Sequence, residues 1–328
     1  MTYDEAIVQF TSLFNHEMSD DAMRSFLIDM KLDETTPVEV IAAAAHVMRK
    51  HAIPLPISEE LRDNALDIVG TGGDKIGSFN ISSTVALLVA SCGATVAKHG
   101  SRSITSKSGS ADMFEALGVR LDLTMQQSAK LLEETGFTFM FAQNHHPAMK
   151  FIVPVRRSIT DKTIFNILGP LTNPAGVKKS MLGVFDKAFV PKIAQALQIN
   201  GATSALVVSS NEGMDEISIS DVTYASFLKE GDMREFIIDP QEYGIKKAPL
   251  EAIMGGDARE NANILRNIFD DTATEAQKDI VLINTAASLM VDGLARDIQD
   301  GLEMAREAIA NARPKVKLKQ IIETSNKL

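Results

Sequence analysis

The stretch that decides the fold is LDIVGTGGDKIGSFNISSTVALLVASCGATVAKHG, residues 66–100. It begins with a short apolar run at 66–69 that ends in glycines, continues into an apolar helix predicted over 82–91, and returns to an apolar run at 94–97. Gly93 follows the predicted helix directly, and glycine commonly ends a helix. A strand, a helix and a strand at this spacing predict two parallel strands with the helix on one face.

The same alternation continues along the chain. Further helices are predicted over 111–117 and 191–198, and further strands over 137–142, 181–185 and 205–209. Residues 214–240 are predicted to be rich in strands, and the chain from residue 257 onward is predicted to be mostly helical. The pattern predicts an α/β protein with a mostly parallel central sheet and helices on its faces.

The first 65 residues are predicted to contain helices only. Thr2 and Glu5 form a capping box at the start of one helix. Another start signal combines Thr36 as N-cap, Pro37 in the first turn and Glu39 as the capping-box acid. Short helices of this kind bury their apolar faces poorly alone, so we expect them to pack on the rest of the chain or on a second copy.

A helical segment at 161–168 interrupts the α/β pattern and is expected to rejoin the N-terminal helices. The sequence therefore predicts a small helical domain of residues 1–65 plus about 160–178. The larger α/β domain is expected to comprise residues 66–159 and 179–328.

Composition and charge limit the classes of partner. The chain has 33 Lys and Arg against 43 Asp and Glu, and a net charge of −10 argues against nucleic acid as the main partner. The single cysteine, Cys92, excludes an internal disulfide framework and a cysteine-based zinc site. No apolar run approaches the roughly 20 residues that span a membrane, and no secretory signal is visible. We expect an acidic, soluble, cytoplasmic protein.

The first candidate site is the glycine-rich turn Gly70-Thr71-Gly72-Gly73-Asp74. Glycine lets backbone N–H groups approach an anion closely, although a tight turn at the strand exit explains this motif equally well. Four polar residues then precede the apolar part of the predicted helix at 85–90: Ser78, Asn80, Ser82 and Ser83. Such side chains cap a helix and, with its free N–H groups, can bind a phosphate.

The second candidate is Lys98-His99-Gly100-Ser101-Arg102, which we expect in a loop after the strand at 94–97. It is followed by the serine-rich segment 106–112, which contains Ser110. Cations and serines in an otherwise acidic protein favour a phosphate pocket at the carboxyl ends of parallel strands; a solvated basic loop is the alternative. Two such loops indicate a ligand with phosphates at both ends.

Two further groups complete the candidates. Asp215-Glu216 could hold Mg²⁺ through phosphates, although acidic pairs in turns are usually only solvated. His145-His146 lacks a third ligand at zinc-like spacing and is interpreted as a helix start lining a cleft. The neighbouring Arg156 and Arg157 are typical of surface residues on one helix, although one of them could bind a carboxylate through two of its guanidinium nitrogens.

With these motifs in place, the sequence resembles the anthranilate phosphoribosyltransferase family over essentially its whole length. The resemblance implies transfer of a ribose 5-phosphate unit from phosphoribosyl pyrophosphate to the amine of anthranilate, with release of pyrophosphate. It also implies Mg²⁺, two ions per subunit, and a homodimer formed through the helical parts. The matching segments are GTGGD (70–74), FNISS (79–83), KHGSRSITSKSGSADMFEALG (98–118), HHPAM (145–149), TIFNILGPLTNPA (163–175), MDEIS (214–218), GGDARENA (255–262) and VLINTAASL (281–289).

Carried over motif by motif, the resemblance implies roles for individual residues but no dedicated acid or base. The donor would contact Gly70, Gly72, Gly73, Asp74, Ser78, Asn80, Ser82, Ser83, Lys98 and Ser110. Anthranilate would contact Gly70, His99, Ser101, His146 and Arg156. Magnesium would be held by Ser82, Asp215 and Glu216.

Two departures from the family pattern bear on the acceptor. Ser101 stands where the family usually has Asn, and a hydroxyl cannot span the distance that an amide spans. Residues 158–162 replace the family's usual Glu-Leu-Gly-x-Arg. The rival functions are a pyrimidine nucleoside phosphorylase and a nucleic-acid-binding relative without transferase activity. The phosphorylase is disfavoured because its glycine-rich signatures are not found here and because Asp215-Glu216 is intact. The nucleic-acid-binding relative is disfavoured by the acidic charge and the intact glycine and Asp-Glu motifs.

Overall fold

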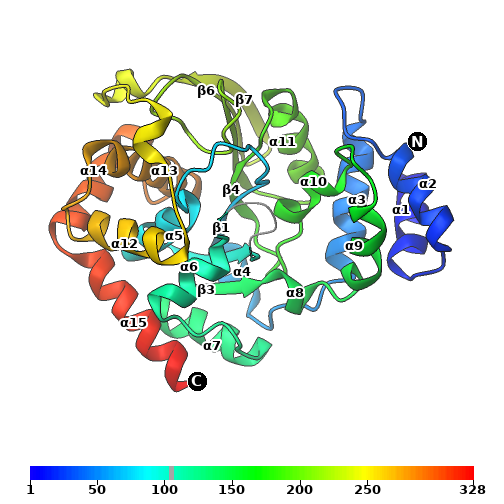
Figure 1. The fold of residues 1–328 in the computed structure, drawn as a ribbon, viewed down its shortest axis with the longest axis horizontal. Helices are drawn as coiled ribbons and strands as arrows, with labels where there is room; N and C mark the ends of the chain where they lie inside the picture. Colours follow the sequence, from blue (N-terminus) through cyan, green and yellow to red (C-terminus); the bar gives the residue numbers. More distant parts are fainter. Residues whose placement is uncertain (103–106) are drawn as a thin grey trace.

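A seven-stranded sheet forms the centre of the molecule (Figure 1). The computed structural model describes residues 1–102 and 107–328. The strand order is β3-β2-β1-β4-β5-β6-β7; the first five strands run parallel, and β6 and β7 are antiparallel. This confirms the predicted mostly parallel sheet. The strands are β1 (Ala65–Gly70), β2 (Thr95–Gly100), β3 (Phe137–Phe141), β4 (Lys179–Gly183), β5 (Ser204–Ser210), β6 (Thr223–Lys229) and β7 (Asp232–Ile238).

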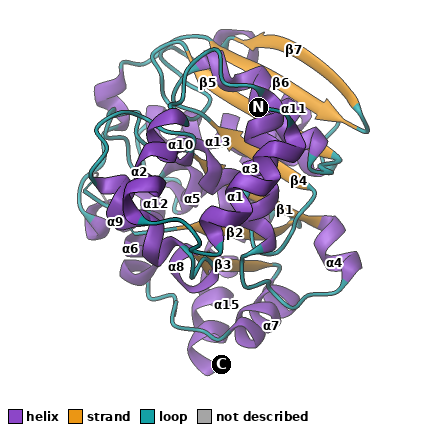
Figure 2. Ribbon diagram, turned by 90° about the vertical axis from the view of Figure 1, so that its right-hand side faces the viewer, coloured by secondary structure: helices purple, strands orange, loops and turns teal. Residues whose placement is uncertain are grey.

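Helices cover both faces of this sheet (Figures 1 and 2). Their bounds are α1 (Tyr3–Phe14), α2 (Asp20–Asp29), α3 (Val38–Lys50), α4 (Glu59–Asn64), α5 (Ile81–Ser91), α6 (Ser110–Leu117), α7 (Met125–Thr135), α8 (Ala142–His145), α9 (Met149–Arg157), α10 (Phe165–Leu168), α11 (Val190–Ile199), α12 (Ala258–Phe269), α13 (Glu275–Asp292), α14 (Ile298–Ala310) and α15 (Arg313–Lys327). In the described chain, no helix has the length and apolar character that crossing a membrane requires.

Two large apolar cores lie on opposite faces of the sheet. Successive residues of β5 alternate between them, because side chains alternate along a strand. Leu206 and Val208 join the core formed with α5, α6 and α12 to α15. Ala205 and Val207 join the core formed with α1, α2, α3, α10 and α11. Strand β5 is therefore buried on both faces, which is typical of strands in parallel sheets covered by helices, whereas the antiparallel edge strand β7 is mostly exposed.

The predicted helix starts differ in accuracy. Thr2 and Glu5 form the predicted capping box of α1. The prediction for α3 was wrong, because Pro37 is the N-cap and makes no side-chain capping bond. The hydroxyl of Thr36 accepts a hydrogen bond from the Asp33 N–H at 3.1 Å instead, so it stabilises the preceding turn. A residue before proline favours extended backbone, which keeps Thr36 outside the helix.

The segment at 161–168 packs beside the N-terminal helices, although its helix, α10, begins only at Phe165. The Leu32 N–H donates to the Lys162 carbonyl at 2.9 Å, and the Ile164 N–H donates to the Met30 carbonyl at 3.0 Å. Helix α9 also joins this side of the molecule, since Ile152 lies in the same core as α1 to α3. The exact domain boundaries stay a prediction.

Candidate active site

The carboxyl ends of β1 and β4 meet the loop that carries Asp215. A Cβ atom on Gly183, the last residue of β4, would lie 1.5 Å from the main-chain oxygen of Asp215. A Cβ atom on Gly70 would lie 2.2 Å from Asp215 Oδ2. The Gly72 N–H donates a hydrogen bond to the same Oδ2 at 2.7 Å. Glycine at these strand ends therefore lets the glycine-rich turn and the Asp215 loop approach each other.

Three carboxylates converge at this point. Asp74, Asp215 and Glu216 each offer an oxygen within 4.8 Å of the others. Burial, and then the charge of Asp215, raises the pKa of Asp74 to about 6. Burial and the charges of Asp215 and Asp74 raise the pKa of Glu216 well above its usual range. A divalent cation would offset this repulsion, and oxygen ligands of this kind suit Mg²⁺.

Lys98 is a buried cation beside these carboxylates. Its side chain is 1% exposed, and Nζ donates to the Ile68 carbonyl at 2.5 Å and to Ser82 Oγ at 3.4 Å. Burial lowers the pKa of Lys98 to about 8, although Asp67, Glu216 and Asp215 counteract this. The expectation that Lys98 lies in a loop was wrong, because β2 continues to Gly100. The Ile68 carbonyl satisfies the ammonium, so the strand can bury it.

The start of α5 faces the same region. Ser82 contacts Lys98, and Ser83 is fully buried, with an Oγ that has no hydrogen-bond partner in the described chain. A helix N-terminus with an unpartnered hydroxyl can bind a phosphate through N–H groups, the helix dipole and the hydroxyl.

Asn80, the N-cap of α5, connects three segments. Its amide donates to the Ser108 carbonyl at 3.2 Å, and its Oδ1 accepts bonds from Ser108 Oγ at 3.2 Å and from Asn261 Nδ2 at 2.8 Å. Asn261 also accepts from the Gly256 N–H at 2.8 Å. Ser78 pairs with Met254 in the same region. The contribution of 254–261 to this edge was missed because that segment is distant from Asn80 in the sequence.

In the predicted basic loop, the positive charge of Arg102 is compensated by acidic side chains, which the sequence did not predict. Arg102 forms ion pairs with Asp112 at 2.9 Å and Glu115 at 2.6 Å, so its charge is compensated locally. Ser101 is exposed, and its Oγ donates to the Arg102 carbonyl at 3.1 Å. Ser110 is the first residue of α6, and a Cβ atom on Gly100 would lie 3.4 Å from its Cβ. Residues 103–106, including Ser106, lie outside the described residues.

The histidines gather on the opposite face of β2. His99 and His146 have ring centroids 5.2 Å apart, and Nε2 of each lacks a hydrogen-bond partner among residues 1–102 and 107–328. Burial, followed by the other histidines, lowers the pKa of His99 well below its usual range. Burial and His145 lower the pKa of His146 to about 4. Both rings are therefore neutral at pH 7, and they can donate or accept without carrying charge.

Arg156 lies on α9, with its guanidinium carbon 5.9 Å from the centroid of the Phe165 ring. Burial lowers the pKa of Arg156, which remains a cation at pH 7. The structure joins His99 to His146 directly, whereas the contact that Arg156 makes is with Phe165. The Lys98 side of β2 thus holds the three converging carboxylates and hydroxyls, and the His99 side holds neutral rings together with the buried Asp67, whose carboxylate accepts from the His99 N–H at 3.1 Å.

Comparison with known families places this arrangement in context. A family model described as "Glycosyl transferase family, a/b domain" matches residues 62–313. The anthranilate phosphoribosyltransferase of Xanthobacter autotrophicus is 42% identical over 328 residues, which are 100% of this chain and 94% of that protein. The enzyme of the same name from Rhodopseudomonas palustris is 40% identical over 99% of this chain and 94% of its own length.

Solved structures agree in fold. The anthranilate phosphoribosyltransferase of Thermus thermophilus superposes with a TM-score of 0.92 at 36% identity, covering 99% of this chain and 96% of that one. The Saccharomyces cerevisiae enzyme in complex with phosphoribosyl pyrophosphate and Mg has a TM-score of 0.86 at 26% identity, covering 99% and 93%. A complex of the yeast enzyme with 4-fluoroanthranilate has a TM-score of 0.83 at 26% identity, covering 99% and 92%.

Proposed function

Because this chain belongs to the anthranilate phosphoribosyltransferase family, we infer that it transfers the 5-phosphoribosyl group from phosphoribosyl pyrophosphate to the amine of anthranilate. Pyrophosphate is released, and the product is N-(5-phosphoribosyl)anthranilate, an intermediate of tryptophan biosynthesis. The observation that carries this inference is the convergence of Asp74, Asp215 and Glu216 beside the glycine-rich turn. Such a cluster suits a donor that brings a diphosphate and a divalent cation.

Magnesium is the cofactor of this proposal. Asp215, Glu216 and Ser82 would hold it, with two ions per subunit. The raised pKa of Glu216 supports this assignment, because crowded carboxylates favour a bound cation or a proton. When bound, magnesium would neutralise the charge that develops on the leaving diphosphate.

The phosphoribosyl donor would lie along the edge formed by the glycine-rich turn and the start of α5. The unpartnered Ser83 hydroxyl and the buried Lys98 ammonium support a phosphate at this edge. Lys98 would place a positive charge near the diphosphate while the Ile68 carbonyl holds its position. The full set proposed for the donor is Gly70, Gly72, Gly73, Asp74, Ser78, Asn80, Ser82, Ser83, Lys98 and Ser110.

Anthranilate would lie on the His99 face, next to the neutral His99 and His146 rings. Gly70, Ser101 and Arg156 would complete this subsite, with Arg156 available to the acceptor carboxylate. The aromatic amine is neutral at pH 7, so it can attack C1 without a general base. Positioning amine and C1 together, with stabilisation of the diphosphate, would supply the rate enhancement.

The assembly and location are also part of the proposal. We expect a cytoplasmic homodimer that contacts its partner through the helical domain, residues 1–65 plus about 160–178. Residues 66–159 and 179–328 would form the domain that binds phosphoribosyl pyrophosphate.

The reaction is tested by the loss of anthranilate fluorescence after mixing with phosphoribosyl pyrophosphate. We expect loss that requires Mg²⁺, matches pyrophosphate release and stops when a chelator is added. Donor binding without loss of fluorescence would indicate another acceptor and direct attention to Ser101. Phosphorolysis of a pyrimidine nucleoside, or a salt-dependent gel shift with nucleic acid, would instead favour a rival function.

A further inference from the structure

Asn284, in the middle of α13, binds both main-chain polar groups of Ile217. Its Oδ1 accepts a hydrogen bond from the Ile217 N–H at 2.9 Å, and its Nδ2 donates to the Ile217 carbonyl at 2.8 Å. Nδ2 also donates to the Ile280 carbonyl of α13 at 2.8 Å. The Asn284 side chain is only 3% exposed. A buried amide satisfied in this way fixes the peptide that it binds, because breaking the contact leaves unpaired polar groups.

Ile217 directly follows Glu216, so this contact lies next to the carboxylate cluster. Asn284 also lines a small cavity together with Ser82, Asp215 and Glu216. The contact therefore connects the main chain of the acidic loop to a long helix that packs against α5, whose first turn carries Ser82.

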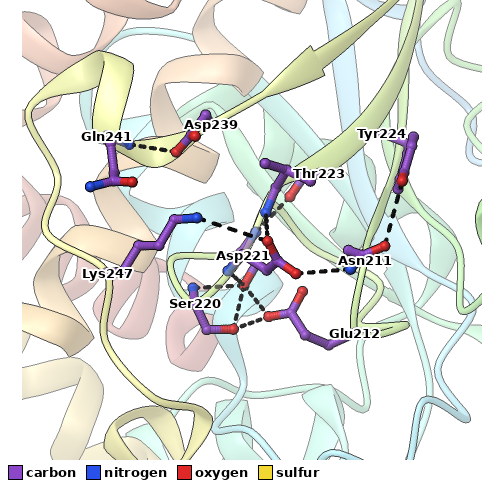
Figure 3. Close-up of polar contacts among 11 residues, drawn as sticks. Asn211, Glu212, Ser220, Asp221, Thr223, Tyr224, Asp239, Gln241 and Lys247 are labelled. Atoms are coloured by element: carbon purple, nitrogen blue, oxygen red, sulfur yellow. Dashed lines mark hydrogen bonds and ion pairs between the residues drawn. The ribbon is translucent and has the colours of Figure 1, made fainter.

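The remainder of this loop is held by its own polar side chains, as Figure 3 shows. Glu212 accepts bonds from Ser218 Oγ at 2.7 Å and from Ser220 Oγ. Asp221 accepts from Asn211 Nδ2 at 2.8 Å and lies 3.8 Å from Lys247 Nζ. These contacts close the loop at its base, whereas Asn284 fixes the position of the segment beside Glu216 relative to α13.

We propose that Asn284 is a positioning residue for magnesium binding: it holds the Asp215-Glu216 segment against α13 so that the carboxylates stay together and face Ser82. The proposal rests on the proposed function. Like charges crowded at this point repel one another. The Gly72 N–H and the end of β4 hold the segment at Asp215, on the side away from Ile217. Without the Asn284 contact, the Glu216 side of the segment can relax away from Ser82, and the site then binds the metal-bound donor more weakly.

The direct test is Asn284→Leu, which keeps a similar volume and removes every hydrogen bond to Ile217. Asn284→Ala is the second variant. A water molecule can enter the vacated space and bond to the main chain of Ile217, so this variant should show a smaller effect than Asn284→Leu. The matched control is Thr285→Val, since Thr285 is the next residue, is fully buried, and has a hydroxyl without a partner in the described chain.

We expect the Mg²⁺ concentration for half-maximal turnover to rise about tenfold in Asn284→Leu, which loses both hydrogen bonds to Ile217, and less in Asn284→Ala, where water can replace them. The KM for anthranilate should change by less than about twofold, and Thr285→Val should match the wild type in each assay. An unchanged Mg²⁺ requirement, or an equal rise in the Mg²⁺ requirement and the anthranilate KM, would overturn the proposal. If Asn284→Leu does not fold, Asn284→Ala decides by the same criteria.

A binding measurement separates this proposal from the assigned reaction. Phosphoribosyl pyrophosphate premixed with Mg²⁺ is titrated into each protein by calorimetry without acceptor, and again with a chelator. Weaker Mg²⁺-dependent binding by the Asn284 variants, with Thr285→Val unaffected, supports the positioning role even if anthranilate is not the acceptor. Equal affinity in all the proteins refutes it, even where the wild type catalyses the assigned reaction.

Discussion

The main-chain oxygen of Asp215 occupies the space that a Cβ atom on Gly183 would need, since the two positions lie 1.5 Å apart. The end of β4 and the acidic loop are therefore in direct backbone contact. The site depends on this contact because the loop carries two of the three converging carboxylates.

Gly183→Ala should displace the acidic loop. We expect a loss of about 1–3 kcal/mol in the free energy of unfolding, because the added methyl group meets main chain that cannot rotate away. Turnover at limiting Mg²⁺ should fall more than about tenfold. Chemical denaturation and a Mg²⁺ titration of the reaction measure the two effects.

The control for this substitution is Gly169→Ala. Nothing lies within 4 Å of a Cβ atom at Gly169, but Gly169 precedes Pro170 and has the helical φ of −49° and ψ of −53° that a residue with a side chain avoids before proline. Alanine there should therefore lower the unfolding free energy by less than about 1 kcal/mol, through local backbone strain and without a clash. Equal losses of stability in the two variants would contradict the argument from backbone contact.

Asp215→Asn combined with Glu216→Gln should abolish Mg²⁺-dependent turnover while leaving the protein folded. The amides keep the shape of the side chains but remove the charges that attract the metal. Steady-state kinetics over a range of Mg²⁺ concentrations and circular dichroism test the two parts. Full turnover in the double variant would exclude these residues as the metal ligands.

Asp74→Asn should make the metal-free protein more stable above about pH 6. Because the pKa of Asp74 is raised to about 6 in the folded state, folding favours its protonated form, and this stabilisation is lost as the pH rises from about 4 through 6. The variant has no titrating carboxyl at this position and does not lose this stabilisation. Its free energy of unfolding should therefore exceed that of the wild type at pH 8 but not at pH 4. Denaturant titrations in a chelating buffer at both pH values measure this difference in unfolding free energy. A larger difference in favour of the variant at pH 4 than at pH 8 would contradict the prediction.

Arg24→Ala should weaken acceptor binding more than donor binding. Arg24 on α2 donates to Ser158 Oγ at 2.5 Å and to the Ser158 carbonyl at 3.3 Å, directly after the helix that carries Arg156. Since the pair is exposed, we expect less than about 1 kcal/mol of lost stability. The KM for anthranilate should rise about two- to fivefold, with the KM for the donor unchanged.

Arg313→Ala is the matched control for Arg24→Ala, because Arg313 makes a similarly exposed contact, with Glu307 at 2.7 Å. Its KM values should equal those of the wild type. In Arg24→Ala, a rise in the KM for both anthranilate and the donor, or a rise in neither, would show that the Arg24–Ser158 contact does not act specifically on acceptor binding.

Local patterns predicted much of this molecule. The order of the strands, most of the helices, the capping box of α1 and the helical segment that rejoins the N-terminal helices could be derived from periodicity and from glycine and proline positions. Helix α7 was not predicted. The resemblance implied Asp215 and Glu216 as magnesium ligands and Asp74 as a donor contact. The convergence of Asp74 with the other two carboxylates was not predicted, since no local rule relates a turn after β1 to a loop after β5.

Other features depended on tertiary contacts. Lys98 and His99 looked like loop residues because they are polar, yet a carbonyl on β1 and the Asp67 carboxylate stabilise them within β2. Thr36 looked like an N-cap, but its hydroxyl is used by the turn before it. Asn261 and Asn284 were not predicted as part of the site, because their partners are distant in sequence and an asparagine within a helix has no distinctive local signature.

The opposite orientations of Lys98 and His99 on β2 limit how this enzyme can vary through evolution. Inserting or deleting one residue in that strand would exchange the two side chains between the two faces of the sheet. The ammonium would then meet the histidine rings and Asp67, and the imidazole would meet Asp74, Asp215 and Glu216. Point substitutions can change the side chains on one face of the sheet without affecting the other. A change in the length of β2 alters both faces at once. Lineages that acquire a different acceptor should therefore keep the length of this strand and diversify at residues such as Ser101 and Ser158, which lie beyond strand and helix ends.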